Sequence, residues 1–276
     1  MVAAVQDTGG QLMSRRPGFP AQLELPSARP APVRKSGSLA PARASTVAEA
    51  GQRGTPGGVG LDSQAVRARM VEKLAAQGIA DSRVLDAMGK VERHRFVDSA
   101  LVNQAYEDTS LPIGLGQTIS KPNVVARMIE LLLGGRNDAA GKLGRVLEIG
   151  TGCGYQAAVL SVLATEVYTI ERLRGLHEKA RDNLRPFRLP NVHLLFGDGM
   201  AGYARGAPYA GIIAAAGGNA VPQAWAEQLA VGGRIVAPTV MPNGQQALVV
   251  MERTAREMKQ TVLEAVHFVP LKSGIA

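Results

Sequence analysis

The fold of this chain is decided by the stretch Val146-Leu147-Glu148-Ile149-Gly150-Thr151-Gly152-Cys153-Gly154-Tyr155. Its apolar first part is typical of a buried strand, its glycines of a tight turn, and its last residues of a helix start. Glycines at such a turn can adopt positive φ and let a ligand lie against the backbone. A loop that leads into a helix also exposes unpaired N–H groups. The stretch therefore predicts a nucleotide-like cofactor bound at the carboxyl end of a strand.

The sequence on both sides of this turn predicts an α/β fold. Short apolar runs alternate with helical patterns, and strands that are nearly all apolar are typical of a parallel sheet with helices on both faces. Two later runs are expected to add an antiparallel edge. The expected strands are residues 145–149, 167–171, 192–196, 210–215, 234–238, 246–253 and 261–269. The expected helices between them are residues 155–163, 175–184 and 222–229.

Helical periodicity dominates the region before the sheet. A first helix is expected to be capped at Asp62 or Ser63 and to end at Gly78, and a second to follow Asp81. An irregular, glycine-rich stretch comes next. A third helix is expected to begin at Pro122, because proline suits the first turn of a helix.

The first 60 residues differ in composition from the rest of the chain. They are rich in Ala, Pro, Gly, Ser and Arg and carry +4 of the formal net charge of +8. Such a segment cannot bury enough apolar surface to offset its ordering entropy, so we predict a disordered tail over residues 1–60. The alternatives are a partner-binding or targeting arm, or translation that starts at Met70. The remaining domain, residues 61–276, divides into a helical part over 61–135 and an α/β core over 143–276.

The composition excludes several classes of protein. No run approaches the ~20 consecutive apolar residues of a membrane span, and the start of the chain does not resemble a secretory signal. The single cysteine, Cys153, excludes an internal disulfide and a cysteine-built zinc site, and the four histidines show no metal-ligand spacing. We therefore expect a metal-free, soluble protein of the cytoplasm.

The net charge raises the question of a nucleic-acid partner. Outside the tail the excess is only +4, and no dense cluster of Lys and Arg with interleaved aromatic residues occurs there. We therefore expect neither nucleic acid nor a membrane as a partner, and we expect a monomer.

The spacing of the glycines argues against a dinucleotide. The dinucleotide fingerprint needs Gly-x-Gly-x-x-Gly, whereas the glycines here are Gly150, Gly152 and Gly154. Tyr155 stands where the third glycine should be. An acid ahead of Gly-x-Gly-x-Gly, here Glu148, resembles instead the first motif of the S-adenosylmethionine-dependent methyltransferases. The resemblance implies S-adenosyl-L-methionine as the cofactor, with no metal.

Two further acids stand at the ends of the next two strands. Glu171 ends the second strand, where a carboxylate can accept both ribose hydroxyls. Asp198, in Phe196-Gly197-Asp198-Gly199, follows the third strand, where the adenine amino group would lie. Because the carboxyl ends of parallel strands meet at one edge, three acids in this order are stronger evidence than the glycine turn alone.

A segment before the sheet resembles a more specific signature. The segment Leu111-Pro112-Ile113-Gly114-Leu115-Gly116-Gln117-Thr118-Ile119-Ser120-Lys121-Pro122 resembles that of the protein-L-isoaspartate O-methyltransferases. The resemblance covers roughly residues 65–275. It implies a Rossmann-like methyltransferase sheet with a helical N-terminal addition. It also implies methyl transfer to the free α-carboxyl of L-isoaspartyl and D-aspartyl residues in damaged proteins and peptides, which begins their repair. Further matching stretches are residues 146–156, 197–199 and 229–238 and the closing Phe268-Val269-Pro270-Leu271.

The family resemblance also implies roles for individual residues. In that family the Thr-Ile-Ser segment lines the site where the substrate carboxylate meets the methyl donor, and the match places the catalytic role on Ser120. By the same resemblance the Gly150 loop holds the methionine portion, Glu171 the ribose, and Asp198 with Gly199 the adenine. The expected cofactor-binding residues are Gln117, Thr118, Ile119, Ser120, Glu148, Gly150, Thr151, Gly152, Cys153, Glu171, Asp198 and Gly199.

Alternatives remain open at several residues. Ser120 can also cap the helix that follows it, and Cys153 is expected to pack in the turn rather than to act as a nucleophile. The family usually has an aspartate at the start of the fourth strand, where this chain has Ala210 and Gly211, and residues 214–219 lack a hydroxyl often found there. A low-activity or non-catalytic relative, and a methyltransferase for RNA or a small molecule, are therefore the alternative functions.

Overall fold

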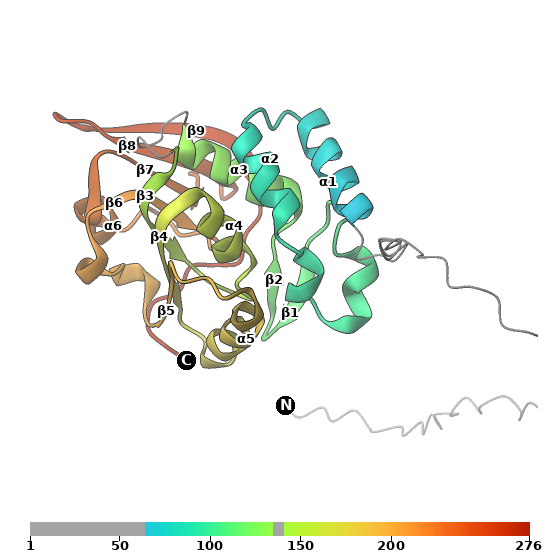
Figure 1. Cartoon of the computed structure of the whole chain (residues 1–276). Coiled ribbons are helices and arrows are strands. Elements are labelled where there is room, and N and C mark those ends of the chain that lie inside the picture. Colours follow the sequence, from blue (N-terminus) through green and yellow to red (C-terminus); the bar gives the residue numbers. More distant parts are fainter. Residues whose placement is uncertain (1–63, 135–140) are drawn as a thin grey trace, which may run out of the picture. The chain divides into compact units, whose positions relative to one another are not determined.

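A seven-stranded sheet forms the centre of the fold (Figure 1). The computed structural model describes residues 64–134 and 141–276. The strands are β3 (Leu143–Ile149), β4 (Ala164–Glu171), β5 (Val192–Phe196), β6 (Tyr209–Ala214), β7 (Leu229–Val240), β8 (Gln246–Arg253) and β9 (Met258–Val266). They lie in the order β5-β4-β3-β6-β7-β8-β9, with parallel pairing as far as β7 and antiparallel pairing from β7 to β9. This confirms the predicted parallel sheet with an antiparallel C-terminal edge.

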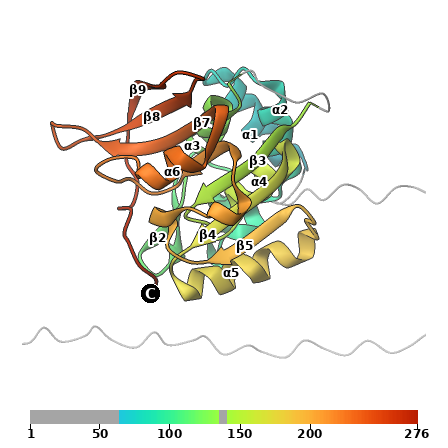
Figure 2. The ribbon, with the colours of Figure 1, turned by 90° about the vertical axis from the view of Figure 1, so that its left-hand side faces the viewer.

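Helices cover both faces of this sheet (Figure 2). Val146 of β3 belongs to a buried apolar cluster with α3, α4 and α5, whereas Leu147 belongs to a second cluster with Trp225 of α6. Neighbouring residues of a strand point to opposite faces, so the two side chains enter different clusters. Burial on both faces explains why these strands are nearly continuous apolar runs. The helices are α1 (Gln64–Ala76), α2 (Ser82–Lys90), α3 (Pro122–Leu133), α4 (Tyr155–Leu163), α5 (Arg174–Leu184) and α6 (Gln223–Gln228).

The three N-terminal helices follow their local sequence signals. The carboxylate of Asp81 accepts a hydrogen bond from the backbone N–H of Arg83 at 3.0 Å and so caps α2, as predicted. α1 ends just before Gly78, which has a φ of 101°. α3 starts at Pro122 and ends at Leu133, and Gly134 caps it in the left-handed conformation, which glycine adopts without strain.

Part of the N-terminal prediction lies outside the described residues. The expected caps of α1, Asp62 and Ser63, and the expected tail over residues 1–60 both lie there. None of the helices within the described ranges has the length and apolar character that crossing a membrane requires.

The glycine-rich stretch between α2 and α3 is more regular than the sequence predicts. In it β1 (Leu111–Gly114) pairs antiparallel with β2 (Gln117–Ile119). Gly114, Leu115 and Gly116 make the turn, all at positive φ. Strands of three or four residues are too short to leave a recognisable alternating pattern, which is why periodicity misses this hairpin. Two short 3-10 helices, η1 (Arg93–Phe96) and η2 (Ser99–Gln104), precede it.

The last strand ends earlier than expected, and this redirects the chain. β9 ends at Val266, whereas the sequence predicts a strand to residue 269. Beyond it the side chain of Gln246 bonds both backbone groups of Phe268, accepting from its N–H at 2.7 Å and donating to its carbonyl at 3.1 Å. The side chain thus replaces the ladder bonds of the strand and turns the chain toward the carboxyl ends of the parallel strands.

Candidate active site

A cavity of about 430 Å³ opens at the carboxyl ends of β3, β4 and β6. Its walls come from the β1–β2 hairpin, the glycine loop after β3, the end of β4 and the C-terminal segment. This volume lies in the range of small-molecule and cofactor sites. The place is the one where parallel α/β sheets bind their ligands, as the glycine turn predicts.

The glycine loop is held open as a cradle. Gly150, Gly152 and Gly154 all have positive φ, at 88°, 58° and 93°. A Cβ on Gly152 would come within 3.2 Å of Ile113 in the hairpin, so only glycine leaves the backbone accessible there. The carboxylate of Glu171 accepts from the Gly152 N–H at 2.9 Å and so fixes the loop to the end of β4.

Glu148 places a carboxyl group inside the fold, beside the cavity. It is fully buried, and the hydroxyl of Thr169 donates to its Oε2 at 2.5 Å. Its Oε1 has no hydrogen-bond partner among the described residues. Burial raises the pKa of Glu148 to about 8, while the hydrogen bond from Thr169 opposes that rise. An uncompensated carboxyl oxygen in a cavity wall is suited to a ligand that carries an ammonium group.

The Ser120 segment forms the opposite wall. Ser120 is half-buried and lines the cavity together with Gln117, Thr118 and Ile119 of β2. The cap position of α3 is Lys121, and it makes no side-chain cap bond. The alternative that Ser120 caps α3 is therefore wrong.

A backbone N–H at the start of α3 finds its hydrogen-bond acceptor in another part of the chain. The backbone N–H of Asn123 donates to the carboxylate of Asp108 at 2.8 Å. Because Asp108, which is distant in sequence, already accepts from that N–H, the hydroxyl of Ser120 remains available for a ligand.

The last eight residues, 269–276, form what we call the C-terminal strap. Gly217, after β6, exchanges backbone bonds of 2.8 Å with Val269 and Leu271. Farther on, Gly274 donates to the carboxylate of Asp198 at 2.6 Å, and Ala276 bonds the backbone after β4. The strap therefore crosses the carboxyl ends of three parallel strands and closes one side of the cavity.

Most of the predicted site residues meet in this cavity. Those in its lining are Gln117, Thr118, Ile119, Ser120, Glu148, Gly150, Thr151, Gly152, Cys153, Glu171 and Gly199. Asp198 is the exception: its two carboxylate oxygens accept from the N–H groups of Met200 and Gly274, and the residue is not part of the lining.

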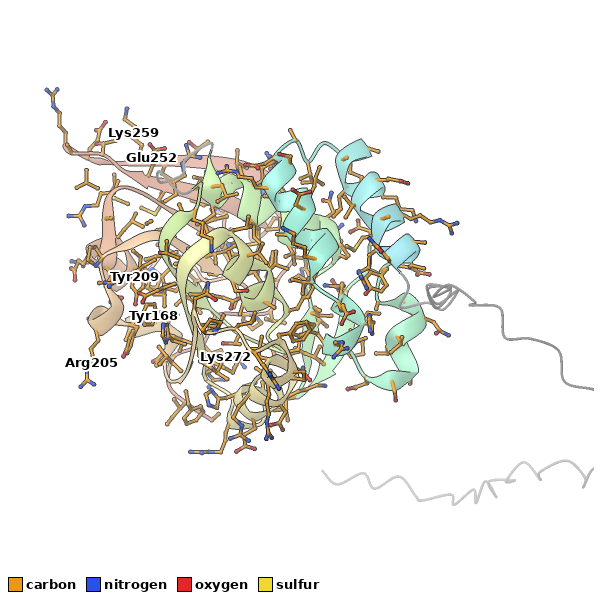
Figure 3. The ribbon with its side chains drawn as sticks, viewed as in Figure 1. Tyr168, Arg205, Tyr209, Glu252, Lys259 and Lys272 are labelled. Carbon is orange, nitrogen blue, oxygen red and sulfur yellow. The ribbon has the colours of Figure 1, made fainter. Side chains whose placement is uncertain are left out.

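Sequence reasoning missed several residues of the lining. They come from the hairpin, from the ends of the parallel strands and the loops after them, from the helices α3, α4 and α5, and from the strap. Lys272 of the strap, labelled in Figure 3, lies in the same lining as the α5 residue Leu176. Two signals were available, since the quoted signature that holds Ile113 and Leu115 and the closing Val269-Pro270-Leu271 run both resemble the family. The missed lining residues are Ile113, Leu115, Gly116, Val125, Ile149, Tyr155, Gln156, Ile170, Arg172, Leu173, Leu176, Ala215, Ala216, Val269, Pro270, Leu271 and Lys272.

Cys153 has the environment of a packing residue. It is buried, and this burial raises the pKa of its thiol to about 11. A thiol with that pKa carries almost no thiolate at neutral pH, which argues against a nucleophile. Within the described ranges, no group of three or more His, Cys, Asp and Glu side chains could hold a metal ion.

The departure at Ala210 and Gly211 lies away from the cavity. Both residues belong to the first half of β6, and Gly211 pairs with Val146 at the middle of β3. A Cβ on Gly211 would come within 2.9 Å of Leu132, so glycine here lets α3 approach the sheet. The cavity instead receives Ala215 from the opposite end of β6. The replacements at Ala210 and Gly211 therefore lie away from the cofactor site, whereas Ala215 and Ala216, in the stretch that lacks the hydroxyl, line it.

Known proteins are similar to this chain in sequence and in fold. A family model described as protein-L-isoaspartate(D-aspartate) O-methyltransferase matches residues 65–276. A protein-L-isoaspartate O-methyltransferase from Methylibium petroleiphilum is 55% identical over 265 residues, which cover 94% of this chain and 96% of that protein. Another, from Leptothrix cholodnii, is 59% identical over 79% of this chain and 77% of its own length.

Solved structures agree with this relationship. A protein-L-isoaspartate O-methyltransferase structure superposes with a TM-score of 0.67 at 26% identity, over 76% of this chain and 67% of that chain. A Plasmodium falciparum chain solved with S-adenosyl-L-homocysteine has the same fold, with a TM-score of 0.65 at 21% identity over 75% of this chain and 98% of that one. The chain therefore belongs to the protein-L-isoaspartate(D-aspartate) O-methyltransferase family.

Proposed function

We propose that this chain methylates the free α-carboxyl of L-isoaspartyl and D-aspartyl residues in damaged proteins and peptides, with S-adenosyl-L-methionine as the donor. The observation that carries the proposal is the meeting of the Ser120 segment and the glycine loop in one cavity. Family membership over almost the whole domain supports the same reaction.

The residues present fit this cofactor. Glu148 offers an unpartnered carboxyl oxygen for the ammonium group of the methionine portion, beside the cradle of Gly150 and Gly152. Glu171 lines the cavity, and each of its oxygens keeps a lone pair beyond the backbone bonds that it accepts. We assign it to the ribose hydroxyls. When bound, the cofactor supplies an electrophilic methyl group on a sulfonium.

The adenine contact falls to the end of β5. Gly199 lines the cavity, and a Cβ there would come within 2.5 Å of Ile149, so the position has no room for a side chain. We also assign Asp198 to this end, because its carboxylate oxygens can each accept one more bond beyond those from Met200 and Gly274.

The main task of the protein in this reaction is to align the substrate carboxylate with the methyl group of the donor. A carboxylate is already ionised at neutral pH, so no general base is needed. The hydroxyl of Ser120 donates to one oxygen of the substrate carboxylate and so directs the other toward the methyl group. Placing the reacting atoms near contact distance supplies most of the rate enhancement. The hairpin and the strap, which wall the cavity, exclude the water that would compete.

The other candidate functions have less support. The low-activity alternative was motivated by Ala210 and Gly211, which lie away from the cavity, and by the missing hydroxyl in residues 214–219, of which Ala215 and Ala216 line the cavity. RNA or a small molecule as the substrate finds no support in the Ser120 segment. We further propose that the enzyme acts as a cytoplasmic monomer without a nucleic-acid partner. The single cysteine suits a reducing compartment, and sedimentation velocity tests the monomer.

A pair of matched peptides tests the activity. The two peptides have the same sequence and differ only in one residue, L-isoaspartyl in the first and L-aspartyl in the second. With methyl-labelled cofactor we expect base-labile label on the isoaspartyl peptide alone. Equal labelling of both peptides, or of neither, would refute the proposed function.

A further inference from the structure

Arg93 is a charged side chain buried outside the motifs discussed above. It lies in η1 and is 0% exposed. Within residues 64–134 and 141–276 no ion pair involves it. Burying a charge without an opposite charge is costly. The groups that Arg93 contacts should therefore explain why a cation is buried at this position.

Those contacts join the two walls of the cavity. The Nη2 of Arg93 donates to the backbone carbonyl of Ser120 at 2.7 Å, and its Nε donates to the carbonyl of Ala105 at 2.8 Å. The guanidinium carbon lies 4.7 Å from the centroid of the Tyr155 ring. Tyr155 is the first residue of α4, directly after the glycine loop, and it lines the cavity. One planar group therefore touches the Ser120 segment and the start of the cofactor-binding helix.

We propose that Arg93 is a positioning residue that sets the distance between the Ser120 hydroxyl and the glycine loop, and hence between the substrate carboxylate and the methyl donor. This inference rests on the proposed function. Arg93 does not line the cavity, so it acts through Ser120 and Tyr155 and does not touch the substrate itself.

The geometry explains why arginine occupies the position. The guanidinium group is planar and carries donors on separate nitrogens. It can therefore bond two carbonyl acceptors and face one aromatic ring at the same time. Lysine has one ammonium on a flexible stem, so it cannot hold both carbonyls in the same directions while it faces the ring. The bond to Ser120 also uses the carbonyl of that residue, which restrains the peptide from which the hydroxyl projects.

The test compares Arg93→Lys with Arg95→Lys. Arg95 belongs to the same 3-10 helix but is half-exposed and pairs with Glu92, so it serves as the matched control. Cofactor affinity is measured by calorimetry, and kcat and KM are measured with the isoaspartyl peptide at saturating cofactor. We expect the cofactor Kd of Arg93→Lys to stay within about threefold and kcat to fall by about 30-fold or more, because a displacement near 1 Å can cost about 100-fold. The control should keep both constants within about twofold.

A double-mutant cycle separates positioning from general support of the fold. If Arg93 acts through Ser120, Arg93→Lys should lower kcat by less than about threefold in a Ser120→Ala background, because the group to be positioned is gone. Losses that multiply independently would overturn the inference, as would an Arg93→Lys kcat within twofold of the parent. If Arg93→Lys fails to fold, Arg93→Gln, which keeps one donor to a carbonyl, takes its place in the same cycle. A parent enzyme that does not methylate the peptide would instead refute the proposed function.

Discussion

At the scale of single residues, the Ser120 hydroxyl is the group closest to the chemistry in this account. It lines the cavity and does not cap α3, so its role toward the substrate does not compete with a structural one. A hydrogen bond to a charged group contributes about 1.5–3 kcal/mol. Ser120→Ala should therefore lower kcat about 10- to 100-fold while the cofactor Kd stays nearly unchanged, as steady-state kinetics and calorimetry would show. Ser99→Ala, on the exposed surface of η2, is the control. A Ser120→Ala enzyme with parental kinetics would contradict the assignment.

Glu148 makes the stability of the cofactor-free protein depend on pH. Its pKa is about 8 in the fold and 4.5 as the ordinary value, so between these pH values the folded state holds a proton that the unfolded state releases. Stability should therefore fall by on the order of 5 kcal/mol as the pH rises from 4.5 to 8, and it should stay level above pH 8.

The variant Glu148→Gln isolates this effect. It removes the titration, so its melting temperature should fall less than that of the parent between pH 5 and pH 8. Its cofactor Kd should rise, because the carboxylate that faces the ammonium group is gone. Glu178→Gln, an exposed change on α5, should keep the parental slope. Parallel pH profiles for the parent and Glu148→Gln would show that Glu148 does not carry the dependence.

Sequence reasoning finds residues that belong to contiguous motifs and misses those that act across the fold. The Gly150 loop, Glu171 and Ser120 were accessible because each stands in a local pattern. Arg93 was not, since its partners Ala105 and Ser120 are brought to it only by folding. The N-cap alternative for Ser120 failed for a related reason: Asp108, fifteen residues before Asn123, supplies the acceptor for the start of α3.

At the scale of secondary-structure elements, the parallel strands were predictable and the cavity walls were not. A strand buried on both faces leaves a mostly apolar run, as in β3 and β6 at the centre of the sheet. The β1–β2 hairpin is too short for such a pattern. The strap has no regular structure, and its place is set by single bonds such as that from Gly274 to Asp198.

The strap gives a prediction at this scale. Deleting residues 273–276 removes the bond to Asp198 and the pairing of Ala276 with Arg172, so the strap residues that line the cavity lose two of their anchors. The cofactor Kd should rise about 3- to 10-fold, chiefly through faster dissociation, which corresponds to roughly 1 kcal/mol. Stopped-flow dissociation measures it. Ser273→Ala, which keeps the backbone bonds of the strap, should behave as the parent. Tighter binding after the deletion would mean that the strap competes with the cofactor.

At the scale of the whole molecule, the site is built from one domain. Among the residues that the structure describes, the cavity lining runs from Ile113 to Lys272. Deleting residues 1–60 should therefore leave kcat and KM for the isoaspartyl peptide within about twofold. The same peptide assay on the truncated and the full chain checks this. An inactive truncation would assign the N-terminal segment a part in catalysis.

The most direct test of the account is a crystal structure with S-adenosyl-L-homocysteine and an isoaspartyl peptide. The account predicts the cofactor across the glycine loop, its ribose at Glu171, and the peptide carboxylate within hydrogen-bond distance of Ser120 Oγ on the side from which the methyl group leaves. A cofactor bound outside this cavity, or a peptide carboxylate held away from Ser120, would contradict it.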